Sequence, residues 1–137
     1  LPRAAAHQIG DHPVEADRGE RQLTKILETL AVIRPEGRIP LTEIIAAEGT
    51  HLGRNTTAII ITSTDQDFWV NAARDVIRRG VRVIAVLMDP STFGHPRSNE
   101  SLANELALSG IPTYFVREGD DLALALARPY AQAYMPV

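Results

Sequence analysis

The sequence predicts an α/β domain in which a mostly parallel β-sheet lies between layers of helices. Three strand candidates, at 57–62, 81–88 and 112–116, alternate with helical patterns, which is the signature of crossover units. The first two candidates are nearly continuous apolar runs, and such runs are typical of parallel strands that helices cover on both faces. We therefore expect a three-layer fold with helices on both faces of the sheet.

The chain before the sheet begins with a segment of little regular pattern. Residues 1–19 are rich in Pro, Gly, His and Arg. Only 4–9 and 13–16 have the composition of short strands. We expect this segment to form a loose N-terminal edge.

Two helices are predicted next. Over 20–34, apolar residues recur at spacings of three and four, which indicates one amphipathic helix that ends before Pro35. A second, shorter helix has Pro40 at its first position and closes between Gly49 and Gly53. The apolar stripe of the first helix comprises Leu23, Ile26, Leu27, Leu30 and Ile33.

Three further helices connect or follow the strand candidates. They are expected over 67–79, 98–109 and 120–127, with Gly80 and Gly110 ending the first two. The apolar spacing at the start and end of the first of these helices predicts core positions, which are Phe68, Trp69, Val76 and Ile77.

Composition bounds both the size and the chemistry of the protein. With 137 residues and 45% hydrophobic content, the chain suits one domain, expected over 20–129 with a C-terminal tail at 130–137. The balance of 14 basic and 17 acidic residues offers no broad positive surface for nucleic acid or anionic lipid. The absence of cysteine excludes disulfides, thiolate catalysis and cysteine-bound zinc.

The same features predict a cytoplasmic location. No apolar run approaches the roughly 20 residues that span a bilayer, so we expect this segment to make no membrane contact. Its first residues lack the pattern of a signal peptide. Because the chain starts with Leu1, we expect it to be a piece of a longer protein.

Small polar and acidic side chains follow the first strand candidate. Ligands of open parallel sheets bind at the carboxyl ends of the strands, so this cluster occupies the position of a site. The oxygens of Thr62, Ser63 and Asp65 suit a hard divalent cation. Thr64 and Asp67 instead stand three apart before an apolar run, which is the pattern of a helix capping box.

The ends of the other two strand candidates carry similar residues. Asp89 and Ser91 follow the second candidate, where they can join the first cluster or form an ordinary turn. Arg117 follows the third candidate, and Asp120 and Asp121 sit favourably at the start of the last helix. The polar loop 93–99 suits a lid, or a connection in which Ser98 or Asn99 caps the next helix.

Familiar catalytic motifs are missing from the sequence. It contains no Gly-x-Gly-x-x-Gly, phosphate loop or Gly-x-Ser-x-Gly. The four histidines are scattered over different loops without the spacing of a helical metal site, so no role is assigned to them. Tyr130 and Tyr134, in the tail, suit either an anchor for a partner or a frayed terminus.

Three segments together resemble a known family. They are GERQLTKILETLAVIRPEGRIPLTEII at 19–45, TTAIIITSTDQDFW at 56–69, and RRGVRVIAVLMDPSTFG at 78–94. They are similar to the carboxyl-terminal part of the domain-of-unknown-function family 58, whose members carry a von Willebrand factor A-like domain. The resemblance covers about 11–127. It implies the second half of a doubly wound, Rossmann-like sheet.

The resemblance also has implications for partners and metal binding. The family is commonly encoded beside MoxR-type AAA+ ATPases, and many members carry membrane-spanning helices upstream of the A-like domain. The family's metal site uses Asp-x-Ser-x-Ser, which this sequence lacks, and a Thr at the position of Ile39. Only Asp65 matches an acidic ligand, although Thr42 can substitute through a shifted loop. We therefore expect no cofactor and no metal, with Ser63, Asp65 and Asp89 as the weak candidate ligands.

These observations lead to one functional hypothesis and two alternatives. The leading hypothesis is a non-enzymatic protein-interaction module, with a MoxR-type AAA+ ATPase as the implied partner. Its expected interaction surface comprises Thr64, Asp65, Asp67, Asp89, Ser91 and Arg117. The first alternative is a Rossmann-like metal-dependent enzyme or small-molecule-binding domain that uses Asp65 and Asp89. The second follows from the family's strand order, which leaves 57–62 as an exposed apolar edge and predicts a homodimer.

Overall fold

The structure is a computed structural model of the 137-residue chain, and it describes residues 4–6 and 14–130. The chain divides into two compact units, Leu1–Ile44 and Ile45–Val137, which are considered separately below. The boundaries that the sequence predicts at 19/20 and 129/130 stay predictions. The tail from 131 onward, with Tyr134, lies outside the described residues.

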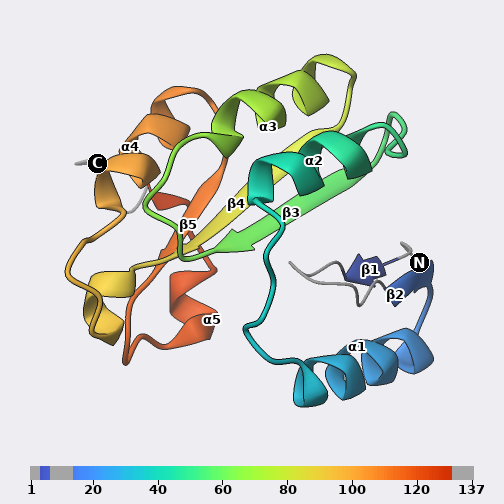
Figure 1. Ribbon diagram of the computed structural model, residues 1–137, viewed down its shortest axis with the longest axis horizontal. Helices are drawn as coiled ribbons and strands as arrows, with labels where there is room; N and C mark the ends of the chain where they lie inside the picture. Colours follow the sequence, from blue (N-terminus) through green and yellow to red (C-terminus); the bar gives the residue numbers. More distant parts are fainter. Residues whose placement is uncertain (1–3, 7–13, 131–137) are drawn as a thin grey trace. The chain divides into compact units, whose positions relative to one another are not determined.

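The first unit contains a two-stranded sheet and a helix (Figure 1). Strand β1 (Ala4–Ala6) pairs antiparallel with β2 (Val14–Asp17). Helix α1 (Glu20–Val32) follows Gly19, whose φ of 80° lies in the region that favours glycine. The predicted helix is confirmed but ends at Val32, because the next residue is already extended. Of the two predicted short strands, the part over 7–13 lies outside the described residues.

The second unit contains a three-stranded parallel sheet. Its strands are β3 (Thr57–Thr62), β4 (Arg82–Met88) and β5 (Thr113–Val116), in the spatial order β3-β4-β5. Figure 1 shows β3 and β4 side by side, with the helices of the crossovers between consecutive strands. The α/β class and the parallel sheet that the sequence predicts are thus confirmed.

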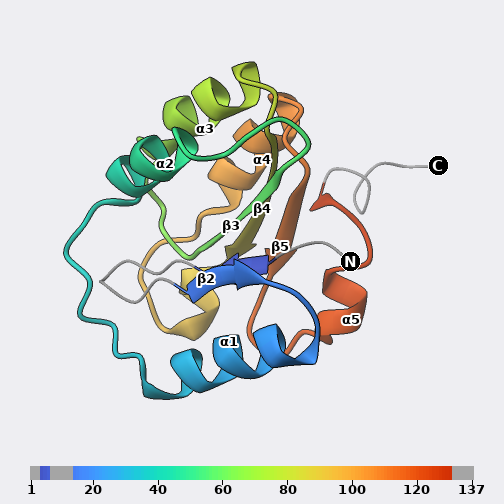
Figure 2. The ribbon, with the colours of Figure 1, turned by 90° about the vertical axis from the view of Figure 1, so that its right-hand side faces the viewer.

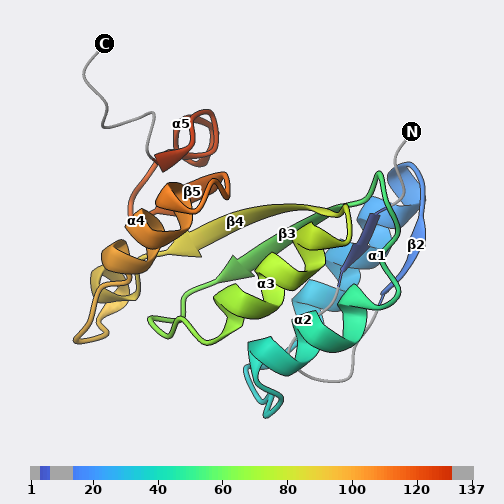
Figure 3. The same ribbon diagram turned by 90° about the horizontal axis from the view of Figure 1, so that it is seen from above.

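The helices of the crossovers cover one face of this sheet. Helix α3 (Trp69–Arg78) packs against β4, and α4 (Glu100–Leu108) packs against β5. Figures 2 and 3 show both helices on the same side of the sheet, and the short α5 (Leu122–Ala125) on the other side, against β5. A 3₁₀ helix, η1 (Pro90–Phe93), follows β4 and was not predicted.

Helix α2 (Leu41–Gly49) spans the division between the units, and its last residues belong to the second one. Its end approaches α3 very closely. A Cβ atom added to Gly49 would lie 2.6 Å from the Cγ2 atom of Val76, so a larger residue here would force the neighbouring atoms to shift.

The core of the second unit lies between the sheet and the helices α3 and α4. Helix α3 contributes an amphipathic stripe at helical spacing, in which Trp69 and Ala73 are fully buried. The further buried apolar residues of this core are Val70, Val76, Val81, Val83, Ala85, Leu87, Leu102, Ala103, Leu106 and Ile111. The predicted core position Phe68 is wrong, because it precedes α3 and its side chain is 70% exposed. Ile77 is also exposed, at 38%.

On the opposite face of the sheet, β3 carries two exposed side chains. Ile59 and Ile61 on that face are 60% and 65% exposed. The apolar composition of 57–62 predicts a strand covered on both faces, whereas the strand order of the resembled family predicts an exposed edge. In the sheet, β3 is an edge strand with alternate residues exposed. An apolar run has the same composition at the edge and in the centre of a sheet, so only strand order separates the two.

The strand register positions the candidate site. Thr62 lies beside Leu87, and Met88 lies beside Val116. The residues that follow the three strands therefore emerge at one carboxyl edge of the sheet, where ligands of such sheets bind.

Among the residues that the structure describes, no helix is long and apolar enough to cross a membrane.

Candidate functional site

Asp89, directly after β4, is the central acidic residue of the carboxyl edge. It is only 4% exposed, and its Oδ1 atom accepts hydrogen bonds from the backbone N–H of Ser91 (3.0 Å) and the hydroxyl of Ser91 (2.7 Å). Its backbone oxygen accepts a further bond from the Thr92 hydroxyl at 2.8 Å. Asp89 thus caps η1, which is the turn that the sequence predicts as the alternative to a ligand position.

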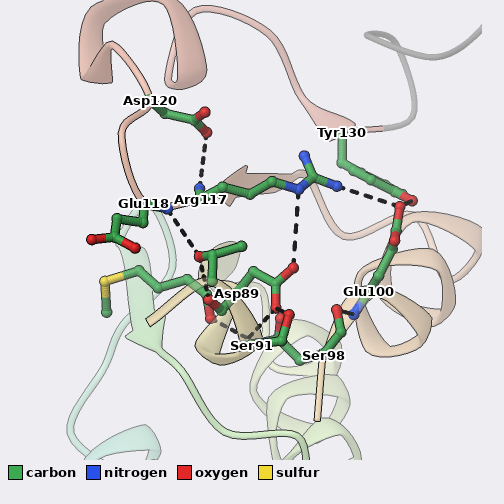
Figure 4. A network of polar contacts seen from close by, with 11 residues as sticks. Asp89, Ser91, Ser98, Glu100, Arg117, Glu118, Asp120 and Tyr130 are labelled. Atoms are coloured by element: carbon green, nitrogen blue, oxygen red, sulfur yellow. Dashed lines mark hydrogen bonds and ion pairs between the residues drawn. The ribbon is translucent and has the colours of Figure 1, made fainter. Parts of the chain in front are cut away.

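Arg117, after β5, lies between two carboxylates (Figure 4). Its Nε atom is 3.9 Å from Oδ2 of Asp89, and its Nη2 atom is 3.5 Å from Oε1 of Glu100. The guanidinium also lies over the ring of Phe115, with 4.5 Å to the ring centroid. Because the side chain of Arg117 is one-third exposed, it connects a buried carboxylate to the surface.

This network extends to the C-terminal part of the second unit. The hydroxyl of Tyr130 donates to Oε1 of Glu100 at 3.0 Å, and the Tyr130 ring meets Phe115 edge to face at 5.5 Å between centroids. The backbone N–H of Arg117 donates to Oδ2 of Asp120 at 2.8 Å. The contacts drawn in Figure 4 therefore tie together the ends of β4 and β5, the start of α4 and Tyr130.

Electrostatics keep the buried carboxyl of Asp89 ionised. Burial raises its pKa, but hydrogen bonds from Ser91 and Ser98 and the charge of Arg117 act in the other direction. The net effect lowers the pKa of Asp89 below its ordinary value. A carboxylate of this kind is a poor proton donor at neutral pH and suits a positioning role better than acid catalysis.

Asp65, after β3, has different partners. Its Oδ2 atom lies 3.7 Å from Nη1 of Arg97, and its Oδ1 atom accepts a bond from the Gln66 side chain at 3.1 Å. The weak candidate metal ligands Asp65 and Asp89 are thus each paired with an arginine of their own. Within residues 4–6 and 14–130, no three His, Cys, Asp or Glu side chains gather as they would around a metal ion.

The capping box predicted for Thr64 and Asp67 is wrong. Helix α3 begins at Trp69 with Phe68 at its N-cap, and no side chain caps it. The Thr64 hydroxyl instead accepts from the backbone N–H of Gln66 at 3.1 Å. The physical reason is loop length, because the helix starts too late for Thr64 to reach its first free N–H groups.

The caps predicted for the next two helices are formed in part. Ser98 accepts from the backbone N–H of Glu100 at 3.2 Å, whereas Asn99, the N-cap of α4, makes no capping bond. Asp121 caps α5 by accepting from Leu124 N–H at 3.2 Å. Asp120 bonds instead to the backbone of Arg117.

Asn99 is a residue whose role the sequence does not reveal. It is 1% exposed, and its Nδ2 atom donates to the backbone oxygens of Thr64 (3.2 Å) and Met88 (3.1 Å). It therefore holds the loop after β3 and the end of β4 against the start of α4. The only sequence signal is an asparagine before a helix, which ordinarily predicts a cap.

Two hollows open near the carboxyl edge. The first, of about 330 Å³, is lined by Ser63, Met88, Pro90, Phe93 and His95. The second, of about 350 Å³, is lined by Phe115, Arg117, Asp120, Asp121, Leu124, Ala125, Arg128 and Tyr130. Large aromatic side chains stand exposed in the loops of the same edge, with Phe68 at 70% and Phe93 at 58%. The sequence predicts Phe68 as a core residue and places Phe93 at the start of a lid or an exposed connection.

Comparisons with known proteins identify no relative of the chain. No family model matches it, and neither a curated protein nor a solved structure is significantly similar to it. The resemblance to the domain-of-unknown-function family 58 therefore rests on the quoted segments alone and stays a prediction.

Proposed function

We propose that this chain is a non-enzymatic protein-interaction module that presents the loops at the carboxyl edge of its sheet to a protein partner. The observation that carries the proposal is the exposure of Phe68 and Phe93 in two loops of this edge. Phe93 also lines the hollow of about 330 Å³, next to Met88 and Pro90. Exposed aromatic side chains, one of them lining a largely apolar hollow, are typical of the anchor points of protein interfaces.

The polar residues of the edge support a structural role around these anchors. Ser91 and Arg117 both contact Asp89, so the three residues help to hold the segments after β4 and β5 in place. Asp65 is paired with Arg97 and is partly exposed, which suits the polar rim of an interface. The predicted surface residues Thr64 and Asp67 lie in the same loop, between β3 and Phe68.

The resemblance to the family supplies the candidate partner, a MoxR-type AAA+ ATPase. A photo-crosslinking amino acid at position 93 or 68 of the full chain tests this proposal in a native lysate. We expect crosslinks to one ATPase at both positions. The matched control is position 108 at the end of α4, where Leu108 is 89% exposed but lies away from the carboxyl edge. Equal crosslinking at all three positions, or none at 68 and 93, would contradict the proposal.

The alternative is a small-molecule-binding or metal-dependent role for the first hollow. It is favoured by the volume of about 330 Å³, which falls within the range of ligand pockets, and by the polar groups of Ser63 and His95 in its lining. Calorimetric titration with magnesium and manganese distinguishes the two proposals. Saturable binding that Asp65→Asn or Asp89→Asn removes would favour the alternative over the interaction module.

A further inference from the structure

Strands β3 and β4 separate at the carboxyl edge of the sheet. The backbone N–H of Arg82 donates to the oxygen of Thr56 at 3.0 Å. Because backbone directions alternate along a strand, the even-numbered residues of both strands direct their N–H and C=O groups toward each other. The register ends with Thr62 beside Leu87. The next contact of this ladder would join the backbone N–H of Thr64 to the backbone oxygen of Met88.

The side chain of Asn99 replaces this contact. The backbone N–H of Thr64 instead donates to the hydroxyl of Thr62 at 3.2 Å. The Nδ2 atom of Asn99 donates to the backbone oxygen of Met88 at 3.1 Å and to that of Thr64 at 3.2 Å. One side-chain amide therefore links the two segments at the point where their backbones diverge.

This bridge requires two N–H groups on one side-chain nitrogen. Serine and threonine carry a single O–H donor, and an ionised aspartate carries none. Asn99 is 1% exposed, and among the residues that the structure describes its Oδ1 atom has no hydrogen-bond partner. A buried acceptor without a partner costs free energy. General stability therefore does not explain an asparagine at this position, whereas the bridge does.

The two bridged carbonyl groups begin the segments that carry the exposed phenylalanines. Phe68 lies in the segment that follows Thr64, directly before α3. Phe93 ends the 3₁₀ helix η1, which follows Met88 after one residue, and both residues line the first hollow. A link between the starts of these segments therefore restrains the spacing of the two aromatic rings.

We propose that Asn99 is a positioning residue of the protein-interaction surface, because its amide sets the spacing of Phe68 and Phe93 before a partner binds. This inference rests on the proposed function, in which these two side chains are the anchors. Anchors that are already held in their bound spacing lose less conformational freedom on binding. Asn99 thus strengthens binding without touching the partner.

A second link joins the same two segments but differs in its environment. Nη1 of Arg97 lies 3.7 Å from Oδ2 of Asp65, and the arginine side chain is 73% exposed. Exposed ion pairs restrain their side chains weakly, because water competes for both charges. The buried amide bridge, rather than this ion pair, is therefore expected to set the spacing.

Double electron–electron resonance measures the spacing directly. The chain contains no cysteine, so Phe68→Cys and Phe93→Cys provide the only attachment sites for two spin labels. We expect a single narrow distance distribution in this labelled chain, and its loss when Asn99→Leu is added. Leucine keeps the shape of asparagine but has no N–H donor. If circular dichroism shows that Asn99→Leu is unfolded, Asn99→Ala takes its place with the same expectation.

Three controls separate positioning from a general loss of stability. Leu106→Ala removes a fully buried side chain of α4 and destabilises the core, but it leaves the bridge intact. Arg97→Ala removes the exposed ion pair. Both should keep the narrow distribution. Labels at Asp75→Cys and Leu108→Cys, on the exposed surfaces of α3 and α4, should report the same spacing with and without Asn99→Leu.

The consequence for binding is measured by photo-crosslinking in a native lysate. With the crosslinking amino acid at position 93, we expect Asn99→Leu to lower the yield of the crosslinked partner. Leu106→Ala should leave this yield unchanged at a temperature where both variants are folded. The comparison separates a lost spacing from a lost fold, because only the first variant removes the bridge.

A distance distribution that stays narrow without the asparagine amide would overturn the inference. It would also be overturned if Leu106→Ala or Arg97→Ala broadened the distribution equally, or if crosslinking stayed the same despite a broader distribution. If the chain with Asn99 intact forms no crosslinks, the proposed function fails instead. The distance measurement would then still decide whether Asn99 sets the spacing of the two segments.

Discussion

The guanidinium of Arg117 lies 3.9 Å from the carboxylate of Asp89, a side chain that is 6% exposed at the end of β4. The pair joins the ends of two adjacent strands, and it leaves Oδ1 of Asp89 to bind Ser91. A buried charge with several partners is costly to disturb, because its partners lose their hydrogen bonds in a place that water reaches poorly.

Removal of this carboxylate should therefore destabilise the protein. We expect Asp89→Ala to lower the free energy of unfolding by about 2–4 kcal/mol, measured by urea denaturation. Asp75→Ala is the matched control. Asp75 pairs with Arg78 on the surface of α3, where its side chain is 60% exposed, so its loss should cost less than about 1 kcal/mol. Equal effects of the two substitutions would show that Asp89 has no special structural role.

The lowered pKa of Asp89 predicts a pH dependence. Its carboxylate contributes stability above the ordinary pKa of aspartate, and this contribution disappears as the pH falls through the lower pKa of the folded protein. The difference in free energy of unfolding between the wild type and Asp89→Asn should be constant near neutral pH and shrink below about pH 4. Urea denaturation over this range measures it. A difference that grows toward acid pH would have the wrong sign.

Phe68 and Trp69 are neighbours in the sequence with opposite environments. Trp69 is 1% exposed in the core, whereas Phe68 is 70% exposed. We expect Trp69→Leu to cost about 2–4 kcal/mol through lost packing, and Phe68→Leu to cost less than about 0.5 kcal/mol. Thermal unfolding followed by circular dichroism compares them. A large effect at position 68 would place that residue in the core and remove its role as an interface anchor.

Two glycines test the packing of α2 against α3. In Gly49→Ala the new methyl group would lie 2.6 Å from Val76, so we expect a loss of about 1–3 kcal/mol in the free energy of unfolding. Gly53→Ala is the control, because a Cβ atom there meets nothing within 4 Å. Chemical denaturation of both variants provides the comparison. If the two variants are equally stable, the backbone at Gly49 lies farther from Val76 than the 2.6 Å calculated for the added methyl group.

The sequence alone predicts much of the fold for a local reason. The sequence predicts the strands β3, β4 and β5 to within one residue at each end, because runs such as TAIIIT and RVIAVLM favour extended backbone and burial regardless of their partners. The start of α1 was also correct, because its apolar residues recur at helical spacing. The predicted capping box at Thr64 and Asp67 is wrong, because α3 begins only at Trp69. The spacing of these two residues does not reveal how long the loop after β3 is.

The candidate site depends on relationships that no local pattern contains. Asp89 and Arg117 meet because β4 and β5 are adjacent in a register that brings Met88 beside Val116. Asn99 bonds to the backbone of Met88 and Thr64, which are distant in the sequence.

Local composition thus determined which segments are strands and helices, through backbone preference and the burial of apolar side chains. Strand order, by contrast, made β3 an edge and β4 a centre. Only the tertiary structure could decide this, because which side chains and backbone groups stay open to a partner depends on what packs beside them.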